Sequence, residues 1–161
     1  MAEVLVFDSK EAAARVVADH VATAVRERPE FTLGVATGST PLPVYAALAE
    51  HAARGLDFSR VAAFALDEYV GLPAGHPQSY AEVVAREVTR PLGLDPARVR
   101  VPDGATAGIA TAGDRYEAAL EANGGVDLQL LGIGATGHLA FNEPGSSFAS
   151  LTRVKTLTER T

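Results

Sequence analysis

A glycine-rich stretch in the last third of the chain holds the residue types best suited to acid–base chemistry. The thirteen residues GIGATGHLAFNEP, at 132–144, contain His138, Asn142 and Glu143. An imidazole and a carboxylate five residues apart on one loop can share a proton. The three glycines permit positive φ angles and close approach of the backbone to another group. We predict a functional site here, although a glycine-rich connection with a solvated histidine has the same pattern, because such signals are weak alone.

A second candidate is the segment Thr37, Gly38, Ser39, Thr40 and Pro41, which precedes an apolar-periodic stretch. Proline suits the first position of a helix, and a hydroxyl just before it can cap that helix. The glycine allows free N–H groups of the first helical turn to face an anion. The lysine of a Walker A loop is absent, so we predict a different kind of anion-binding loop. Helix capping without a ligand is the alternative.

The third candidate is Asp67, the first polar residue after the apolar run 61–66. A carboxylate at the end of a strand, next to apolar walls, can have a raised pKa and act as a base. From spacing alone, a turn or helix-capping role is equally compatible with this position.

The elements that must position these groups alternate between strand and helix. Apolar patterns and capping signals predict strands at 3–7, 31–36, 61–66, 99–101 and 128–133, and helices at 10–28, 44–53, 80–89 and 110–123. This order predicts an α/β fold with a largely parallel, Rossmann-like doubly wound sheet and helices on both faces. We expect the run at 128–133 to be a buried central strand. The three candidates follow strands, so they should meet at one edge of the sheet.

Length and composition narrow the class of protein. The 161 residues suit a single domain, 1–161, and no segment resembles a membrane span or an export signal. The absence of cysteine excludes disulfides and thiolate metal sites and favours a cytoplasmic location. A net charge of −6 argues against a nucleic-acid partner. No metal-ligand cluster is present, so we expect proton transfer on a phosphorylated small molecule without a metal.

Several motifs together resemble the glucosamine-6-phosphate deaminase (isomerase) family. They are TGSTP at 37–41, LDEYVGL at 66–72, HPQSY at 76–80, GHLAFNEPGSS at 137–147 and TRVKTLT at 152–158. The related 6-phosphogluconolactonases share the fold but lack the FNEP segment and usually carry Arg where this chain has Tyr69. A lactonase is therefore the second interpretation.

The resemblance implies an enzyme without a cofactor that converts glucosamine 6-phosphate to fructose 6-phosphate and ammonia in amino-sugar catabolism. Asp67 would move a proton between C2 and C1 of the open-chain sugar. His138 would assist ring opening, with Glu143 orienting it, and residues 37–40 would bind the phosphate. A non-catalytic sugar-phosphate sensor of the same fold is a further alternative, but such sensors tend to lose the base, which this chain keeps.

This chain departs from the family pattern in two respects. Thr136 occupies a position where the family usually has Asp or Asn, so the acid relay around His138 should be weaker or supplied by another group. Family members also continue well past residue 161, with basic residues that complete the phosphate site. The chain is therefore expected to be truncated relative to the family, and to be a poor enzyme alone.

The resemblance also points to regulation. Ser146, Arg153 and Lys155 match residues that bind an acetylated sugar phosphate at a subunit interface in allosteric members of the family. If this chain is a regulated member, the resemblance implies a homo-oligomer.

Overall fold

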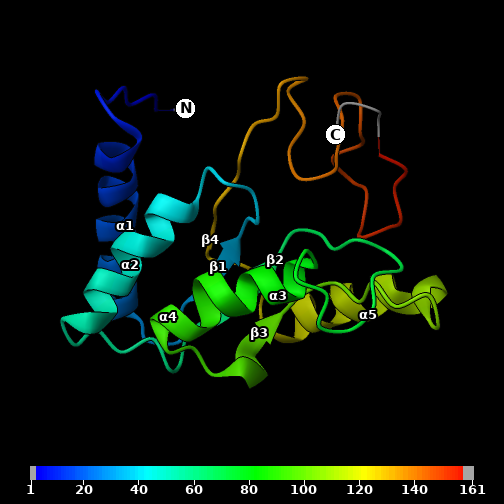
Figure 1. Ribbon diagram of the computed structural model, residues 1–161, viewed down its shortest axis with the longest axis horizontal. Helices are drawn as coiled ribbons and strands as arrows, with labels where there is room; N and C mark the ends of the chain where they lie inside the picture. The colour runs from blue at the N-terminus through cyan, green and yellow to red at the C-terminus, as the bar shows by residue number, and fades with distance from the viewer. Residues whose placement is uncertain (1–2, 158–161) are drawn as a thin grey trace.

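The protein is built on a four-stranded parallel sheet, seen in a computed structural model that describes residues 3–157 (Figure 1). The strands follow the order β3-β2-β1-β4 and comprise β1 (Thr32–Val35), β2 (Ala62–Ala65), β3 (Val99–Arg100) and β4 (Leu128–Gln129). The main helices are α1 (Lys10–Glu27), α2 (Leu42–Ala53), α3 (Tyr80–Val84), α4 (Arg90–Leu92) and α5 (Ile109–Ala122). A π-helical turn, Ala85–Thr89, joins α3 to α4, and a short 3₁₀ turn, Pro96–Arg98, precedes β3.

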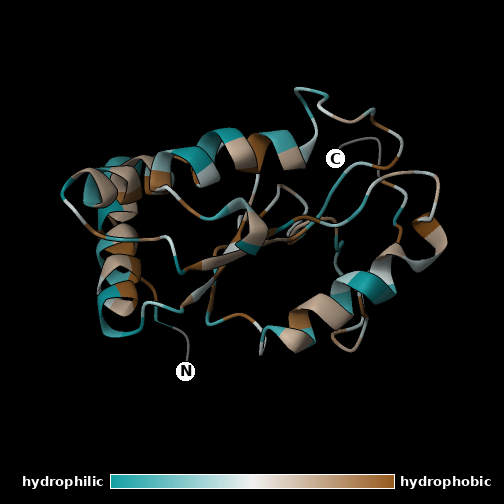
Figure 2. Ribbon diagram, turned by 90° about the horizontal axis from the view of Figure 1, so that it is seen from below, coloured by the Kyte–Doolittle hydropathy of each residue, from teal (hydrophilic) through white to brown (hydrophobic). Residues whose placement is uncertain are grey.

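Helices cover both faces of the sheet, as Figure 2 shows, with α5 on the opposite side from the α3–α4 run. One core combines α1, α2, the helical run at 80–92 and one face of β1 and β2. The other core is smaller and packs Tyr116 of α5 against Ala62 and Phe64 of β2. The predicted α/β fold, with its largely parallel sheet and helices on both faces, is confirmed.

The register of the sheet brings the ends of three strands to one level. Val35 pairs with Ala65 across β1 and β2, and Gly34 pairs with Gln129 across β1 and β4. Extending these pairs past the strand ends places Thr37 beside Asp67 and Gly132. The strand order reverses between β1 and β4, which is where open parallel sheets bind ligands.

Local signals in the sequence fix most of the helix starts. Ser9 caps α1 by accepting a hydrogen bond from the N–H of Ala12 (3.1 Å), and Ser79 caps α3 by accepting one from Glu82 (3.3 Å). The apolar face of α1, with Ala14, Ala18, Val21 and Val25, is buried as its spacing predicts. At α2 the N-cap is Pro41 and makes no side-chain capping bond, so the predicted hydroxyl cap is absent.

Two predicted strands are not formed as expected. Residues 3–7 form no strand, and Val4 and Val6 are largely exposed, because no strand of the described part of the chain pairs with them. The predicted central strand at 128–133 is paired only at β4, which is an edge strand of the sheet described here. Leu131 and Ile133 beyond it are 49% and 80% exposed. Apolar runs indicate burial, but they do not specify the position of a strand in the sheet.

One helix is longer than predicted. The helical run that starts at Tyr80 continues through the π-helical turn to Leu92, past the predicted end at residue 89, and ends at Gly93 with a φ of 67°. No helix between residues 3 and 157 has the length and apolar character needed to cross a bilayer.

Candidate active site

A cavity of about 290 Å³ opens at the carboxyl ends of β1, β2 and β4. Its walls come from the segment after β1, the segment after β2, the start of α3 and the loop after β4. The lining includes Thr37, Gly38, Thr40, Asp67, Tyr69, Tyr80, Gly134, His138 and Phe141. Four separate stretches of sequence therefore contribute polar groups to one open cavity, and three of them are the strand ends that the sequence analysis singled out.

Asp67 is half-buried at the level set by the register of β1 and β2. Burial raises the pKa of its carboxyl group to about 6, because the charged form loses contact with water. A hydrogen bond from the Thr37 hydroxyl works against this rise, and the nearby Glu68 carboxylate adds to it. A carboxyl group with a pKa near 6 can both take up and release a proton close to neutral pH.

The segment after β1 is held at its start by a buried side chain from α2. The Tyr45 hydroxyl donates to the carbonyl of Ala36 (2.7 Å) and accepts from its N–H (3.0 Å). This pair of bonds fixes the backbone just before Thr37. The spacing of apolar residues places Tyr45 on the buried face of α2, but it does not indicate these hydrogen bonds.

Residues 37–40 leave backbone donors available to the cavity. None of the hydrogen bonds found among residues 3–157 uses the N–H groups of Gly38, Ser39 or Thr40. Thr37, Gly38 and Thr40 line the cavity, whereas Ser39 does not. The start of α2 follows directly, so the positive end of its dipole lies near these donors. The segment has the groups needed to bind an anion.

The loop at residues 134–145, called here the His138 loop, carries a chain of three side chains joined by hydrogen bonds. The Thr136 hydroxyl donates to Glu143 Oε2 (2.8 Å) and lies 3.0 Å from Nδ1 of His138. Since this hydroxyl has a single hydrogen, given to Glu143, its oxygen must accept from Nδ1–H of the imidazole. This network leaves Nε2 of a neutral His138 as the acceptor nitrogen.

The imidazole of His138 packs directly over Gly134. A Cβ atom at position 134 would lie 2.1 Å from Cε1 of the ring, so a side chain fits there only if the imidazole moves. The N–H of Gly134 donates to the carbonyl of His138 (2.9 Å), which closes the loop. The three glycines of this stretch therefore differ in role: Gly137 has a φ of 86°, Gly134 makes room for the ring, and Gly132 faces open space.

An aromatic wall completes the cavity. The rings of Tyr69, Tyr80 and Phe141 lie against one another with centroid distances of 4.9 to 6.0 Å. Glu68 supports this wall from behind, since its carboxylate accepts from the N–H groups of Tyr69, Tyr80 and Ala81, each at 2.8 Å. Glu68 therefore caps α3, a role that the sequence did not reveal.

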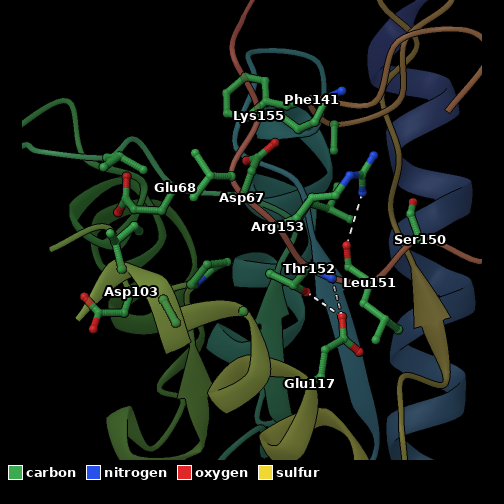
Figure 3. Close-up of a pocket in the computed structure, with 18 of the residues that line it drawn as sticks. Asp67, Glu68, Asp103, Glu117, Phe141, Ser150, Leu151, Thr152, Arg153 and Lys155 are labelled. Carbon is green, nitrogen blue, oxygen red and sulfur yellow. Dashed lines mark hydrogen bonds between the residues drawn. The ribbon is translucent and has the colours of Figure 1, made fainter. Parts of the chain in front are cut away.

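The three residues matched to a regulatory site do not line this cavity. Arg153 and Lys155 line a larger, neighbouring cavity of about 680 Å³, between α5 and residues 150–157 (Figure 3). Ser146 lies outside the lining of both cavities. Asp67, Tyr69 and Phe141 line both, so the two cavities adjoin at these residues.

No cluster of three or more metal-ligating His, Cys, Asp or Glu side chains occurs within residues 3–157. The groups around the smaller cavity are instead a carboxyl group, an imidazole and neutral donors. The fold is therefore an open α/β sheet with polar groups at its switch point, the place where sheets of this class bind small ligands.

The comparisons with known proteins identify the family. Residues 8–150 match the family described as glucosamine-6-phosphate isomerases/6-phosphogluconolactonase. This match covers most of the chain, so the chain belongs to this family. The resemblance seen in the sequence motifs is confirmed.

The relatives similar to this chain include proteins named glucosamine-6-phosphate deaminase. The chain is 55% identical over 159 residues to a glucosamine-6-phosphate deaminase of Pseudarthrobacter chlorophenolicus, covering 99% of this chain and 61% of the relative. A solved structure of a monomeric glucosamine-6-phosphate deaminase superposes with a TM-score of 0.94 at 36% identity, over 99% of this chain and 66% of that one.

A more distant structure shares the fold. The 6-phosphogluconolactonase of Thermotoga maritima superposes with a TM-score of 0.71 at 24% identity, over 87% of this chain and 63% of that one, a likeness of fold alone. The chain spans less than two thirds of the length of each of these three proteins.

Proposed function

We propose that this chain carries the acid–base centre of a glucosamine-6-phosphate deaminase, which converts glucosamine 6-phosphate and water to fructose 6-phosphate and ammonia. The observation that carries the proposal is the meeting of a carboxyl group of raised pKa with a hydrogen-bonded imidazole in one cavity at the switch point. The high identity to proteins named glucosamine-6-phosphate deaminase supports this substrate.

Ring opening is the first step, and we assign it to His138. With Nδ1–H held by Thr136, the imidazole offers its Nε2 lone pair to the proton of the O1 hydroxyl group. That proton passes to the ring oxygen as the bond between C1 and the ring oxygen breaks. The product is an open-chain aldehyde with an amino group at C2.

Asp67 then acts as the base at carbon. Its carboxylate takes the proton from C2, and the electron pair forms a C1–C2 double bond while the aldehyde oxygen gains a proton. Asp67 returns its proton to C1, and the nitrogen at C2 releases one N–H proton, which balances the proton gained by the aldehyde oxygen and leaves a neutral imine at C2. Water adds to this imine and ammonia leaves, so C2 becomes the ketone carbon. A pKa of about 6 suits a group that must accept and release one proton per cycle.

The phosphate is assigned to Thr37, Gly38, Ser39 and Thr40. Their hydroxyl and N–H groups, with the α2 dipole, provide neutral donors. Among the described residues that line the cavity, none is Lys or Arg. A helix dipole near the surface contributes only about 0.3–1 kcal/mol toward an anion. We therefore expect weak phosphate affinity from this segment alone.

Thr136 and Glu143 act through His138. The Thr136 hydroxyl, at a position where the family usually has Asp or Asn, is hydrogen-bonded both to Glu143 and to Nδ1 of His138. Thr136 thus orients the ring and selects its tautomer without carrying charge itself. The roles of these two residues are those of positioning groups for the ring-opening step.

Location, assembly and regulation are also proposed. A phosphorylated sugar is retained inside cells by its charge, so a cytoplasmic location suits this substrate. The predicted homo-oligomer and the regulatory site at Ser146, Arg153 and Lys155 stand together, since that site lies between subunits in allosteric members. The structurally similar deaminase is described as monomeric, so sedimentation of the intact protein with and without an acetylated sugar phosphate tests this part.

The main test is a comparison of two substrates with the intact protein. We expect release of ammonia and fructose 6-phosphate in equal amounts from glucosamine 6-phosphate, and no hydrolysis of 6-phosphogluconolactone above the spontaneous rate. The lactonase alternative draws support from the shared fold. Lactone hydrolysis without ammonia release would replace the proposed function with that alternative, and binding of sugar phosphate without either reaction would favour a sensor.

A further inference from the structure

Helix α5 contacts the segment at 150–157 at two positions that lie one turn apart. The Glu117 carboxylate accepts two hydrogen bonds from Thr152, one from its N–H (2.7 Å) and one from its hydroxyl (2.6 Å), as Figure 3 shows. At Gly113 an added Cβ atom would lie 2.3 Å from the Thr152 carbonyl oxygen. Gly113 and Glu117 therefore form a seat for Thr152, one by leaving space and the other by hydrogen bonding.

The residue after Thr152 reaches back to the His138 loop. Arg153 donates from Nη2 to the side-chain oxygen of Asn142 (2.9 Å) and from Nη1 to the carbonyl of Leu151 (3.1 Å). Asn142 closes a tight turn with Leu139, since their backbone groups exchange two hydrogen bonds of 2.9 and 3.1 Å. This turn connects His138 directly to Glu143 and presents Phe141 to the aromatic wall.

The other face of α5 is fixed to the strand that leads to Asp67. The hydroxyl of Tyr116, the neighbour of Glu117, donates to the carbonyl of Ala65 (2.5 Å), two residues before Asp67. The Tyr116 ring also packs edge-on against Phe64, at a centroid distance of 5.9 Å. One helix thus contacts both the strand that leads to Asp67 and the segment that is hydrogen-bonded to the His138 loop.

The His138 loop needs such a tie because apolar burial does not hold it. From 132 to 157 none of the described residues is buried, and their contacts are mainly hydrogen bonds. Loops with few buried contacts open locally at low cost in free energy. Acid–base chemistry shared between Asp67 and His138 requires that their separation be held closely, since small displacements reduce rates strongly.

We propose that the seat formed by Gly113 and Glu117 sets the position of the His138 loop relative to Asp67, acting through Thr152, Arg153 and Asn142. This inference rests on the function proposed above. Glu117 is a positioning residue, because it contacts Thr152 and none of the groups assigned to proton transfer.

Amide hydrogen exchange tests the seat without any need for turnover. Gly113→Ala and Glu117→Ala should each increase exchange at the N–H groups of Leu139 and Asn142, by about tenfold for the loss of roughly one hydrogen bond in the chain of contacts. Glu117→Gln should restore much of the protection, because its amide oxygen can still accept from Thr152. Glu121→Ala, one turn further along α5 at an exposed position, is the matched control.

In Gly113→Ala, stabilisation of α5 and displacement of Thr152 should change amide exchange in opposite directions. Alanine favours a helix interior over glycine, so α5 itself should become more stable whether or not the seat exists. Faster exchange in the turn at 139–142, in a variant whose helix is stabilised, is expected only if Thr152 is displaced. Unchanged exchange at Leu139 and Asn142 in both Gly113→Ala and Glu117→Ala would overturn the proposal, as would an equal effect of Glu121→Ala.

Kinetics then separate the seat from the proposed function. With glucosamine 6-phosphate, Glu117→Ala should lower kcat about tenfold while KM changes little, because residues 37–40 are untouched. A changed exchange pattern in a protein that releases no ammonia would leave the seat intact and refute the deaminase function. Normal kcat in Glu117→Ala, in a protein that does release ammonia, would refute the seat and leave the function standing.

Discussion

Asp67 and His138 lie in the same cavity but are held by different means. Asp67 follows a strand whose residues are all buried, and the adjoining backbone is fixed by Tyr45 and Tyr116 from helices on opposite faces of the sheet. His138 lies in a loop whose described residues are at most half-buried and which is closed by hydrogen bonds among near neighbours in sequence.

This difference separates two ways of setting the chemistry of a side chain. Burial determines the protonation of Asp67, because loss of water raises its pKa to about 6. Hydrogen bonding determines the orientation and tautomer of His138, through Thr136 and Glu143. Changes at Asp67 should therefore act through charge, whereas changes around His138 should act through geometry.

The largest effect is expected for Asp67→Asn, which removes the proposed base and keeps the shape. Turnover should fall by about 10²–10⁴-fold, the usual contribution of a general base, while phosphate binding is nearly unchanged. Ammonia release and calorimetric titration with glucosamine 6-phosphate measure the two quantities. Asp103→Asn, at an exposed carboxylate paired with Arg115, is the control. A loss of less than about tenfold would assign the base to another group.

The next largest effect tests geometry at the His138 loop with a matched pair of glycines. Gly134→Ala places a methyl group within 2.1 Å of the His138 ring, so the imidazole must move. A displacement of about 1 Å can cost about a hundredfold in rate. At Gly132, which also lines the cavity, nothing lies within 4 Å of an added Cβ atom, so Gly132→Ala adds the same methyl group while leaving the His138 ring in place, and its loss of activity should be much smaller. Equal ammonia release by both variants would show that the ring position is not critical.

The sequence was a better guide to Asp67, which burial controls, than to the His138 loop, which hydrogen bonds control. Asp67 could be singled out because strand periodicity places the first polar residue at the sheet edge, and the register then brings it to Thr37. Strand length was less predictable: the apolar run at 128–133 stays paired only at Leu128–Gln129. Apolarity indicates burial but carries no information on which neighbours cover a strand.

The hydrogen-bonded half of the site was only partly predictable. His138 and Glu143 were visible as residue types at a suitable spacing, and Thr136 was noticed as a departure from the family pattern. That the Thr136 hydroxyl bridges the two depends on the fold of the loop, which spacing does not specify. The support given by Glu68 to α3 was missed for the same reason, since its three partners lie next to it and 12 to 13 residues away.

A smaller effect concerns stability, and its pH dependence identifies burial as the cause. Because the folded-state pKa of Asp67 is raised from 3.8 to about 6, its contribution is most favourable below 3.8 and is lost as pH rises through about 6. Asp67→Asn removes this loss, so the variant should gain on the order of 2 kcal/mol above pH 6 and little at low pH.

Urea unfolding of the two proteins across this pH range measures the difference. Thr37→Val provides a second check, since loss of its hydrogen bond should raise the pKa of Asp67 further and move the transition to higher pH. A stability difference that does not vary with pH would mean that burial does not control the charge of Asp67.

The smallest effect is expected for a change at Thr136. The imidazole of His138 then loses one hydrogen bond but keeps the Glu143 carboxylate nearby. Thr136→Val keeps the shape of the side chain and removes the hydroxyl between His138 and Glu143. A net hydrogen bond contributes about 1 kcal/mol, so turnover should fall about fivefold. The effect is limited because Glu143 Oε1 lies 3.7 Å from Nδ1 of His138, too far to replace the lost hydrogen bond fully but near enough to favour the Nδ1–H form in part. Nitrogen NMR of the imidazole should show a mixture of tautomers in Thr136→Val and a single Nδ1–H form in both the wild type and Thr136→Ser. If Thr136→Val kept both the rate and the tautomer of the wild type, Glu143 alone would orient the ring, and the hydroxyl bridge would have no part in the chemistry of His138.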